Sequence, residues 1–411
     1  MEPYVQAGPM QWTESFCGGA WLASTYADVQ ACLRDPRLSV ARAGTWVNSI
    51  GTSARDELRE LKAIFARSLL FTQGKRHRRL RQVLAPPFGR ASLDRIEPYI
   101  RASVDALLEP LQIDVARGQA FDFIERFARP LPLRVIGRLL GEDSCEDPEV
   151  SRASEEIARF FGEPAPSIAT ARRAQAGAHV LVGRFRNRAY DSASCAGGAE
   201  ILRALIEAQE RGALGARELH VQCAMVLFAG HETTRNLLGN ALHAFLTHRD
   251  QWEVLCSQVR SPSNRDAPWR TPQLRAALLE VLRWNPPVCY TGRRAREDVA
   301  VGNAKIRRGQ LVIAALAAAN RDALRFDRPD EFRANRAEAM PLSFGWGMHA
   351  CIGGELSLLE GQIAFAALAQ RLPRLHIERG ANSWTDNPVY RGLENLEVGS
   401  HEARVHPMSV N

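Results

Sequence analysis

The chain has 411 residues, of which 45% are hydrophobic and 24% are charged, and its formal net charge is +7 at pH 7. These values are typical of a soluble globular protein with one large domain or two ordinary ones. A membrane protein is not expected, because no stretch of the sequence approaches the roughly 20 apolar residues that a membrane span needs. Nucleic-acid binding is disfavoured, because no basic run is interleaved with aromatic residues. The N-terminus shows no secretory signal, so a cytoplasmic location is expected.

Arginine supplies nearly all of the positive charge, because the only lysines are Lys62, Lys75 and Lys305. Codon bias in a GC-rich genome explains such a composition, and a basic face that recruits an acidic partner protein is the functional alternative. The eight cysteines include no CxxC pair, which argues against a disulfide framework or a zinc site.

Helical patterns occupy most of the chain. Thr25 is a candidate N-cap for a short helix through Leu33 that stops before Pro36, and Ser53 is a candidate N-cap for the next helix. Apolar residues then recur at helical spacing over 92–108, 124–140, 171–189 and 200–211, and over the longest stretch, 216–248.

Strand patterns are few and late, at 293–301, at 310–315 and in short pieces after Leu372. The proline- and glycine-containing segments 164–166 and 196–198 look like loops inside the helical region rather than domain linkers. The patterns therefore predict a mainly α body with a minor β region toward the C-terminus.

A glycine-rich loop around Cys351 leads directly into a helical pattern that ends near Arg371. Glycines allow the backbone to fold so that several amide groups point at one sulfur, and the N-terminal end of the following helix lowers the pKa of a thiol. A buried cysteine in a turn is the alternative for an isolated residue. The loop predicts a thiolate that serves as a metal ligand or a nucleophile.

This loop resembles the haem-binding signature of the cytochrome P450 family: Phe, Gly, any residue, Gly, any residue, His or Arg, any residue, Cys, any residue, Gly. The resemblance implies that Cys351 is the axial ligand of the haem iron and that His349 approaches a haem propionate. Ser357 and Leu358 depart from the usual alanine and arginine, beyond the ligand itself. The fixed positions are filled by Phe344, Gly345, Gly347, His349, Cys351 and Gly353, and Glu360 closes the pattern.

Glu280 and Arg283 share one face of a predicted helix and can form an ion pair. Taken alone, such a pair is common on solvated helices and contributes little. Its place before the cysteine loop resembles the Glu-x-x-Arg helix of the family, which implies that the pair supports that loop. The next segment resembles the strand that crosses the haem face, which implies that Arg293 holds a propionate and that Val288 or Cys289 lines the substrate pocket.

Small and polar residues share one face in the middle of the longest helical pattern. Ala229, Gly230 and Thr233 leave room for a flat group, and a threonine hydroxyl bonded to a carbonyl can widen a helix. A helix-packing seam is the alternative. The stretch resembles the oxygen-binding motif of the family, which implies that Thr233 stabilises the activated oxygen and that Glu232 relays protons. His231 fills a variable position of that motif.

His77 and Arg81 lie four residues apart, so they share a helix face and can together bind carboxylates. A solvated basic helix is the alternative. The pair resembles the family's His-x-x-x-Arg, which implies contact with the haem propionates. The preceding segment 72–76 departs from the usual Asp-Pro-Pro start.

Together, these resemblances imply one cytochrome P450 catalytic domain over residues 1–411 and haem b (iron protoporphyrin IX) as cofactor. The implied activity is a monooxygenase that inserts one oxygen atom from O2 into an organic small molecule, by hydroxylation or epoxidation, in secondary metabolism. Electrons then come from a separate ferredoxin or flavodoxin with its reductase, because the chain shows no fused redox domain. A monomer is expected.

Other functions stay open at this point. Oxidative coupling or desaturation uses the same haem chemistry, and a non-catalytic haem-binding sensor needs only the thiolate. Glu232 and Thr233 argue against a haem isomerase, a dehydratase or a peroxide-driven enzyme. The segments expected to shape the pocket, 42–72 and 160–188, have no recognisable code. Five arginines in the second of them would suit an acidic or carrier-bound substrate: Arg172, Arg173, Arg184, Arg186 and Arg188.

Overall fold

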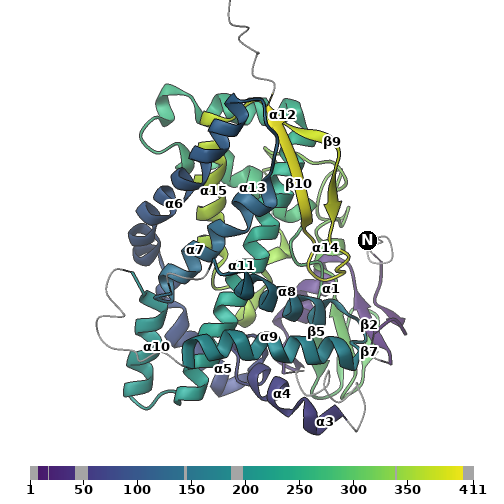
Figure 1. Ribbon diagram of the computed structural model, residues 1–411. Coiled ribbons are helices and arrows are strands. Elements are labelled where there is room, and N and C mark those ends of the chain that lie inside the picture. Colours follow the sequence, from purple (N-terminus) through teal and green to yellow (C-terminus); the bar gives the residue numbers. More distant parts are fainter. Residues whose placement is uncertain are drawn as a thin grey trace, which may run out of the picture.

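The computed structural model describes residues 8–16, 18–41, 54–142, 146–186, 198–337 and 340–400. The predicted N-cap Ser53, Arg188, most of the loop 196–198 and part of the segment 42–72 lie outside these residues. Helices form the larger part of the molecule, and a five-stranded sheet lies at one side of it (Figure 1).

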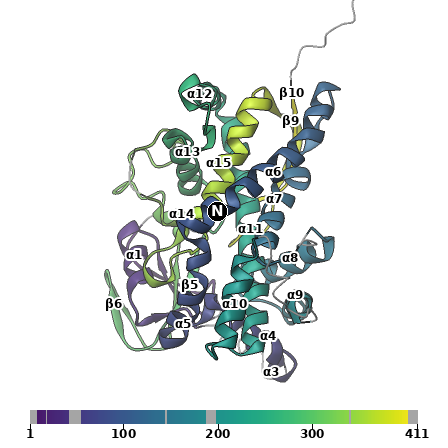
Figure 2. The same ribbon diagram turned by 90° about the vertical axis from the view of Figure 1, so that its left-hand side faces the viewer.

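Helix α11 (Ala216–Thr247) runs through the middle of the helical part (Figure 1). It is buried on most of its surface, because apolar and small residues occupy nearly every face. Figure 2 shows α10 beside it. The other main helices are α1 (Tyr26–Arg34), α4 (Arg59–Phe65), α5 (Gly74–Leu84), α6 (Arg90–Ala116), α7 (Pro130–Leu139), α8 (Pro148–Gly162), α9 (Ile168–Arg186), α10 (Glu200–Glu210), α12 (Arg249–Val259), α13 (Pro272–Trp284) and α15 (Gly354–Arg371).

Most of the predicted helices are present, with shifted ends. The Thr25 side chain accepts a hydrogen bond from the Asp28 amide and caps α1, as expected. The predicted helix over 124–140 is divided into a π-helical turn, η4 (Ile124–Ala128), and α7, which begins at Pro130. Helix α8 was not predicted, although Val150, Ile157 and Phe161 recur at helical spacing on its buried face.

Short helices fill several of the connections. Five of them, η2, η3, α14, η7 and η8, border the cavity described below. These elements are α3 (Ala54–Glu57), η2 (Leu69–Phe71), η3 (Pro86–Phe88), η5 (Pro262–Asn264), η6 (Pro268–Arg270), α14 (Leu316–Ala319), η7 (Leu342–Phe344) and η8 (Gly347–His349).

The main sheet has the strand order β1-β2-β8-β5-β3, in which β2 and β8 are parallel and the other pairs are antiparallel. Three of its strands come from the N-terminal part of the chain, so the expectation of a β region confined to the C-terminal part is wrong. These strands are β1 (Gln11–Thr13), β2 (Ala20–Ala23), β3 (Leu38–Ser39), β5 (Thr291–Ala295) and β8 (Leu311–Ala314).

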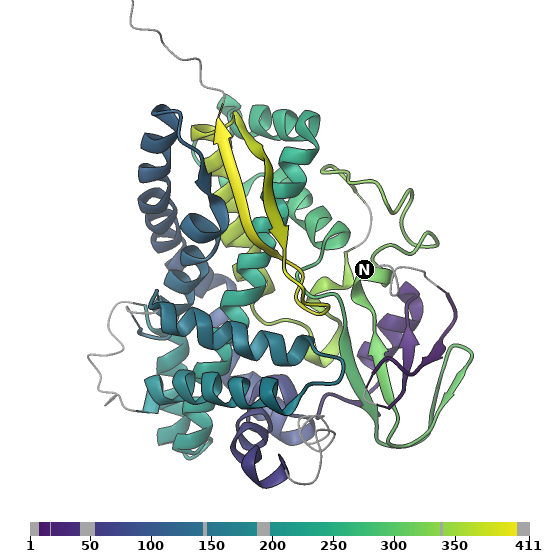
Figure 3. The same ribbon diagram turned by 45° about the vertical axis from the view of Figure 1, so that its right-hand side comes forward.

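The remaining strands form two smaller sheets. The stretch predicted as one strand over 293–301 is divided between β5 and β6 (Val299–Val301), which pairs with β7 (Ala304–Ile306). Strands β9 (Leu375–Trp384) and β10 (Leu393–Ser400) are longer than the short pieces expected, and β10 also pairs with β4 (Phe121–Asp122). They form a long hairpin that lies across the helical part (Figure 3).

The largest hydrophobic cluster surrounds α11, and a second one joins α1 to the main sheet. Within the described parts of the chain, no helix is long and apolar enough to cross a membrane. The helical cluster and the sheet meet at β5 and the cysteine loop, which is where the candidate site lies.

Candidate functional site

A cavity of about 390 Å³ lies between α11, α5, β5 and the cysteine loop. Three of the four motifs contribute their predicted side chains to it, and the Glu-x-x-Arg motif contributes through the segment that follows it. Its lining includes thirteen of the residues predicted for the site: His77, Arg81, Ala229, Gly230, Glu232, Thr233, Val288, Arg293, Phe344, Gly345, His349, Cys351 and Gly353.

The cysteine loop is folded back on itself by short hydrogen bonds. The Cys351 amide donates to the Phe344 carbonyl at 2.8 Å. Gly345 and Gly347 have φ values of 70° and 74°, which only glycine adopts readily. A Cβ at Gly354 would lie 3.3 Å from the Phe344 ring, so a glycine is also needed for close packing there.

The Cys351 side chain is accessible from the cavity although protein atoms surround it. Burial raises the pKa of its thiol, whereas hydrogen bonds from the Gly353 and Gly354 amides and the charge of Arg81 lower it. The amides point at the sulfur as predicted, but the net direction is opposite to the prediction, because desolvation outweighs them. A metal cation at the sulfur is what would make the thiolate stable.

Four basic side chains gather on the same side of the cavity as Cys351. The rings of His77 and His349 lie with their centroids 4.1 Å apart, and Arg81 Nη1 donates to the Ala350 carbonyl at 2.8 Å. Among the described residues, His349 Nε2 has no hydrogen-bond partner. Burial, together with the charges of His77, Arg293 and Arg81, lowers the pKa of His349 to about 3.

Arg293 projects from β5 and is almost fully buried. Its Nη1 atom donates to Thr291 Oγ1 at 3.1 Å and to the Gly292 carbonyl at 2.9 Å. Burial lowers the pKa of Arg293 to about 10. The four basic groups are therefore held in a region that an anionic ligand would stabilise.

The middle of α11 carries the predicted polar groove. Thr233 Oγ1 donates to the Ala229 carbonyl at 2.9 Å, as expected for a threonine that bonds back to its own helix. Gly230 has a second role that the sequence did not reveal. A Cβ there would lie 3.0 Å from Ile136, so the glycine lets α7 pack closely against α11.

Glu232 is buried beside Thr233, and its charge is only partly compensated. Arg235 Nη1 lies 3.6 Å from Glu232 Oε2, whereas Oε1 has no hydrogen-bond partner among the described residues. Burial raises the pKa of Glu232, although Arg235 and Arg129 lower it. The carboxyl group is therefore set up to hold a proton near neutral pH more readily than an exposed glutamate.

His231 is fully buried, and neither of its ring nitrogens has a hydrogen-bond partner in the described part of the chain. Burial and the charges of Arg235 and Arg129 lower its pKa well below the ordinary value. The ring is therefore neutral, which agrees with its interpretation as a filler.

Glu280 and Arg283 form a buried ion pair rather than a solvated one. Arg283 donates to both carboxylate oxygens of Glu280, at 2.7 and 2.8 Å, and the rest of its guanidinium donates to the carbonyls of Asn320, Pro329 and Glu331. Arg336 Nε completes the group at 3.0 Å from Glu280. Both predicted residues lie outside the cavity lining, in agreement with a supporting role.

The ion pair is connected to the cysteine loop through Asn320. Its amide nitrogen donates to Ser343 Oγ and its oxygen accepts from the Leu342 amide, both at 2.8 Å. Ser343 Oγ in turn donates to the Leu282 carbonyl on α13. The residue just before Phe344 is therefore fixed by the same region that holds Arg283.

One predicted pocket residue is misplaced. Val288 lines the cavity, but Cys289 does not and is instead packed in a buried cluster with Phe16 and Val389. Successive side chains of an extended segment point to opposite sides, so Val288 and Tyr290 face the cavity and Cys289 faces away.

Three of the five arginines expected to attract an acidic substrate are engaged within the protein. Arg172 binds Glu57 at 2.5 Å, Arg173 binds Glu156 at 2.9 Å, and Arg184 lies 3.3 Å from Asp147. The acidic partners come from other elements, which is why sequence reasoning missed them. These three ion pairs argue against a role for their arginines in substrate attraction.

Sequence reasoning also missed Glu360 as a cavity residue. It is buried on α15, and burial raises its pKa well above the ordinary value. Its Oε2 atom has no hydrogen-bond partner among the described residues. The sequence placed it at the end of the cysteine signature, but gave no indication that it faces the cavity.

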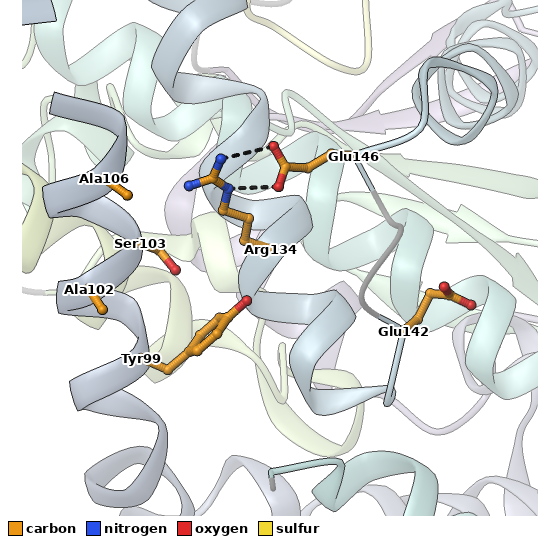
Figure 4. Close-up of a pocket in the computed structure, with 7 residues that line it drawn as sticks. All are labelled: Tyr99, Ala102, Ser103, Ala106, Arg134, Glu142 and Glu146. Carbon is orange, nitrogen blue, oxygen red and sulfur yellow. Dashed lines mark hydrogen bonds and ion pairs between the residues drawn. The ribbon is translucent and has the colours of Figure 1, made fainter. Parts of the chain in front are cut away.

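A second hollow, of about 340 Å³, lies between α6 and α7 (Figure 4). Arg134 and Glu146 at its rim are paired at 2.7 and 3.1 Å, and Glu142 points away from them. No residue predicted for the site lines it. The remaining lining residues are Tyr99, Ala102, Ser103 and Ala106.

Comparison with known proteins gives one consistent result. The family model described as cytochrome P450 matches residues 53–381. Cytochrome P450 107B1 of Saccharopolyspora erythraea is 34% identical over 92% of this chain and 89% of its own. The cytochrome P450 monooxygenase PikC of Streptomyces venezuelae is 32% identical, over 92% of this chain and 84% of its own.

Solved structures agree with these relatives. The crystal structure of P450BioI, in complex with an acyl carrier protein ligated to hexadec-9Z-enoic acid, superposes with a TM-score of 0.83. It is 27% identical and the match covers 97% of each chain. The described elements therefore follow the arrangement of that structure along nearly their whole length.

Proposed function

Because the chain belongs to the cytochrome P450 family, whose members are haem-dependent oxidoreductases, we propose that it is a monooxygenase with a thiolate-ligated haem b. It inserts one oxygen atom from O2 into an organic small molecule, by hydroxylation or epoxidation. The whole chain, residues 1–411, acts as one catalytic domain, because residues from α5, α11, β5 and the cysteine loop line one cavity.

The side chains around the cavity fit a haem. Cys351 would supply its sulfur as a ligand to the haem iron, and His77, Arg81, Arg293 and His349 would bind the haem propionates. The observation that carries this fit is the buried basic group without a counter-ion in the described chain. Its His349 Nε2 lacks a hydrogen-bond partner, and its Arg293 has a lowered pKa.

When bound, haem supplies the iron at which O2 is activated. The contribution of the chain is to manage protons beside it. The Thr233 hydroxyl donates a hydrogen bond to the Ala229 carbonyl, so its oxygen is free to accept a hydrogen bond from another group. Burial raises the pKa of Glu232, so its carboxyl takes up a proton more readily than an exposed glutamate and can pass a proton toward the groove. Phe228 and the other apolar residues of the lining exclude water.

Electrons come from a separate ferredoxin or flavodoxin that docks beside the cysteine loop. Trp346 and Met348 are exposed there, and Arg34 packs against Gly347 between them. Lys75 and Arg78 are exposed on α5, one to two turns before Arg81, which binds the loop carbonyl of Ala350. An apolar centre with cations around it suits a small acidic redox protein.

This docking predicts that the electron-transfer rate falls as ionic strength rises, because salt screens exposed charges. The rate should be measured by stopped-flow reduction with an acidic ferredoxin over a series of salt concentrations. Arg34→Glu should slow the reaction at low salt, whereas Lys62→Glu, on α4, should not. A rate that is indifferent to salt would rule out an electrostatically steered partner.

The ligand assignment is tested by Cys351→Ala. The reduced, carbon-monoxide-bound wild type should show the red-shifted absorption band of thiolate-ligated haem, and the variant should lose it. Cys289→Ala is the matched control, because Cys289 is buried nearby but does not line the cavity. Retention of the band in Cys351→Ala would show that another residue ligates the iron.

A free small molecule is the substrate that the structure favours over a carrier-bound one. P450BioI was solved with an acyl carrier protein, but Arg172, Arg173 and Arg184 of this chain are engaged in internal ion pairs. Oxidative coupling or desaturation remains the second candidate, since it needs the same cavity. Product analysis with the identified substrate separates it from oxygen insertion.

A further inference from the structure

The part of the cavity that lies away from Cys351 has an aromatic wall. Its rings come from segments far apart in the sequence, including η2, α8 and α11, so the wall is a product of the tertiary fold. The six residues of the aromatic wall are Phe16, Phe71, Phe161, Phe228, Tyr290 and Tyr390.

Four of these rings form a continuous row. Phe71 contacts Phe161 with ring centroids 5.5 Å apart, Phe161 contacts Phe228 at 5.7 Å, and Phe228 contacts Tyr390 at 6.1 Å. All three contacts are edge-to-face, the arrangement that aromatic rings prefer. A fifth and a sixth ring, Phe16 and Tyr290, make their own edge-to-face contact at 5.3 Å.

The row reaches the polar groove of α11 directly. Phe228 precedes Ala229, whose carbonyl binds the Thr233 hydroxyl. A molecule held against the row would therefore lie next to the residues that we propose manage protons.

Positive charge is confined to the other side of the cavity. The basic residues in the lining are His77, Arg81, Arg293 and His349, and all four belong to the group around Cys351. Within the described chain, the wall side has no lysine or arginine. An anionic substrate would therefore be buried there without a counter-ion, which is costly.

Two polar side chains on the wall side, Gln222 and Glu163, are already engaged. Gln222 accepts from the Leu69 amide and donates to the Arg67 carbonyl. Glu163 accepts from the Ser167 amide at 3.0 Å and from the Thr170 hydroxyl at 2.7 Å. These bonds satisfy both side chains within the protein, and the Glu163 charge repels anions.

We propose that the substrate is a neutral, largely apolar molecule with an aromatic ring, which packs on the row formed by Phe71, Phe161, Phe228 and Tyr390. This inference rests on the proposed function, because it assumes that the basic group around Cys351 is taken up by haem. It adds the class of the substrate to that function.

The test is a spectral titration of the haem-loaded protein with four probes of one shape. They are 4-phenylbutan-1-ol, its cyclohexyl analogue 4-cyclohexylbutan-1-ol, the anion 4-phenylbutanoate and the cation (4-phenylbutyl)trimethylammonium. The neutral phenyl probe should bind roughly two- to ten-fold more tightly than the cyclohexyl probe. It should bind at least roughly ten-fold more tightly than the anion, which has no counter-ion on the wall side, and more tightly than the cation, which must lose its hydration there.

Variants then locate the preference. Phe161→Leu and Phe228→Leu should each lower the ratio of phenyl to cyclohexyl affinity toward one. Phe65→Leu is the matched control, because Phe65 contacts Phe161 at 5.0 Å but does not line the cavity. Its ratio should stay at the wild-type value. The wild-type series alone still decides the question if a variant does not fold.

The proposal is overturned if either charged probe binds as well as the alcohol, if the cyclohexyl probe binds as well as the phenyl probe, or if none of the four probes binds. It is also overturned if the ratio is unchanged in both wall variants. Its failure is distinct from failure of the proposed function, which the carbon-monoxide spectrum reports before any probe is added. A protein with the thiolate band and the wrong probe preference refutes only the substrate class.

Discussion

Two buried charged groups lie on neighbouring helices, and they are built differently. The first, here called the brace, consists of Glu280, Arg283 and Arg336, and each of its charges is bonded to a partner. The second, here called the relay, consists of His231, Glu232 and Arg235 on α11. It keeps several polar atoms without hydrogen-bond partners among the described residues, including Glu232 Oε1 and both ring nitrogens of His231.

The difference indicates what each group is for. A fully bonded buried ion pair has one stable arrangement, so the brace can fix the position of the cysteine loop. A buried carboxyl with an unpaired oxygen costs stability, and burial raises the pKa of Glu232 toward the range in which protons are exchanged. We infer that this destabilising arrangement is kept in the relay because a proton has to move there.

The brace should show the largest effect. Glu280→Gln removes the negative charge that two buried arginines share, which should lower the free energy of unfolding by about 3–5 kcal/mol. Denaturant unfolding and haem retention after purification measure this. Asp330→Asn is the control, because Asp330 is 77% exposed in its pair with Arg321 and should change stability by about 1 kcal/mol or less. Equal stability of the two variants would show that the brace contributes no more to stability than an exposed surface ion pair.

Thr233, which follows the relay residue Glu232 on α11, should show a large effect on activity and a small one on stability. Thr233→Ala should fold, bind haem and consume NAD(P)H through the redox partner, while product per electron falls several-fold and hydrogen peroxide rises. The reason is that, among the described residues, the hydroxyl bonds only to the Ala229 carbonyl of its own helix, so its loss would remove the proposed proton-handling group without unpairing a charge.

Product, NAD(P)H and peroxide have to be measured together in this experiment. Thr233→Ser, which keeps the hydroxyl, should retain coupling. Thr234 also lines the cavity and can substitute in part, so the double variant with Thr234→Ala is needed. Unchanged coupling in that double variant would show that α11 carries no proton relay.

Local motifs could be predicted from the sequence, whereas contacts between distant residues could not. Motifs that lie within a few residues, such as Glu280 with Arg283 or Ala229 with Thr233, were placed correctly because helical spacing fixes which side chains share a face. The mainly α class followed from the same periodicity. Arg336 as a third partner of Glu280 could not be predicted, because only the folded chain brings residues 56 positions apart into contact.

Other misses have the same origin. The net rise in the pKa of Cys351 depends on how deeply the loop is buried, and no local pattern reports this. The partners of Arg172 and Arg184 come from α3 and from the start of α8. The joining of β1, β2 and β3 to β5 and β8 is likewise a long-range pairing, which alternation within one strand does not reveal.

The sharpest comparison uses one substitution in both groups. Glu232→Gln keeps the shape of the side chain but cannot ionise. Its free energy of unfolding at pH 6 should stay within about 1 kcal/mol of the wild type, in contrast to Glu280→Gln. The readout is denaturant unfolding of the haem-loaded protein at a series of pH values.

The raised pKa of Glu232 predicts the direction in which stability changes with pH. Because burial raises the folded-state pKa of Glu232, the protonated carboxyl contributes stability that is fully present below its ordinary pKa of 4.5 and is lost as pH rises through the raised value. This pH-dependent loss is absent in Glu232→Gln. The free energy of unfolding of the variant should therefore rise relative to that of the wild type as pH rises from 5 to 8. Glu280→Gln should stay less stable than the wild type across that range, since the two arginines keep their charge. If the free energies of unfolding of wild type and Glu232→Gln change with pH in parallel, Glu232 keeps an ordinary pKa. The relay would then have a structural role like that of the brace.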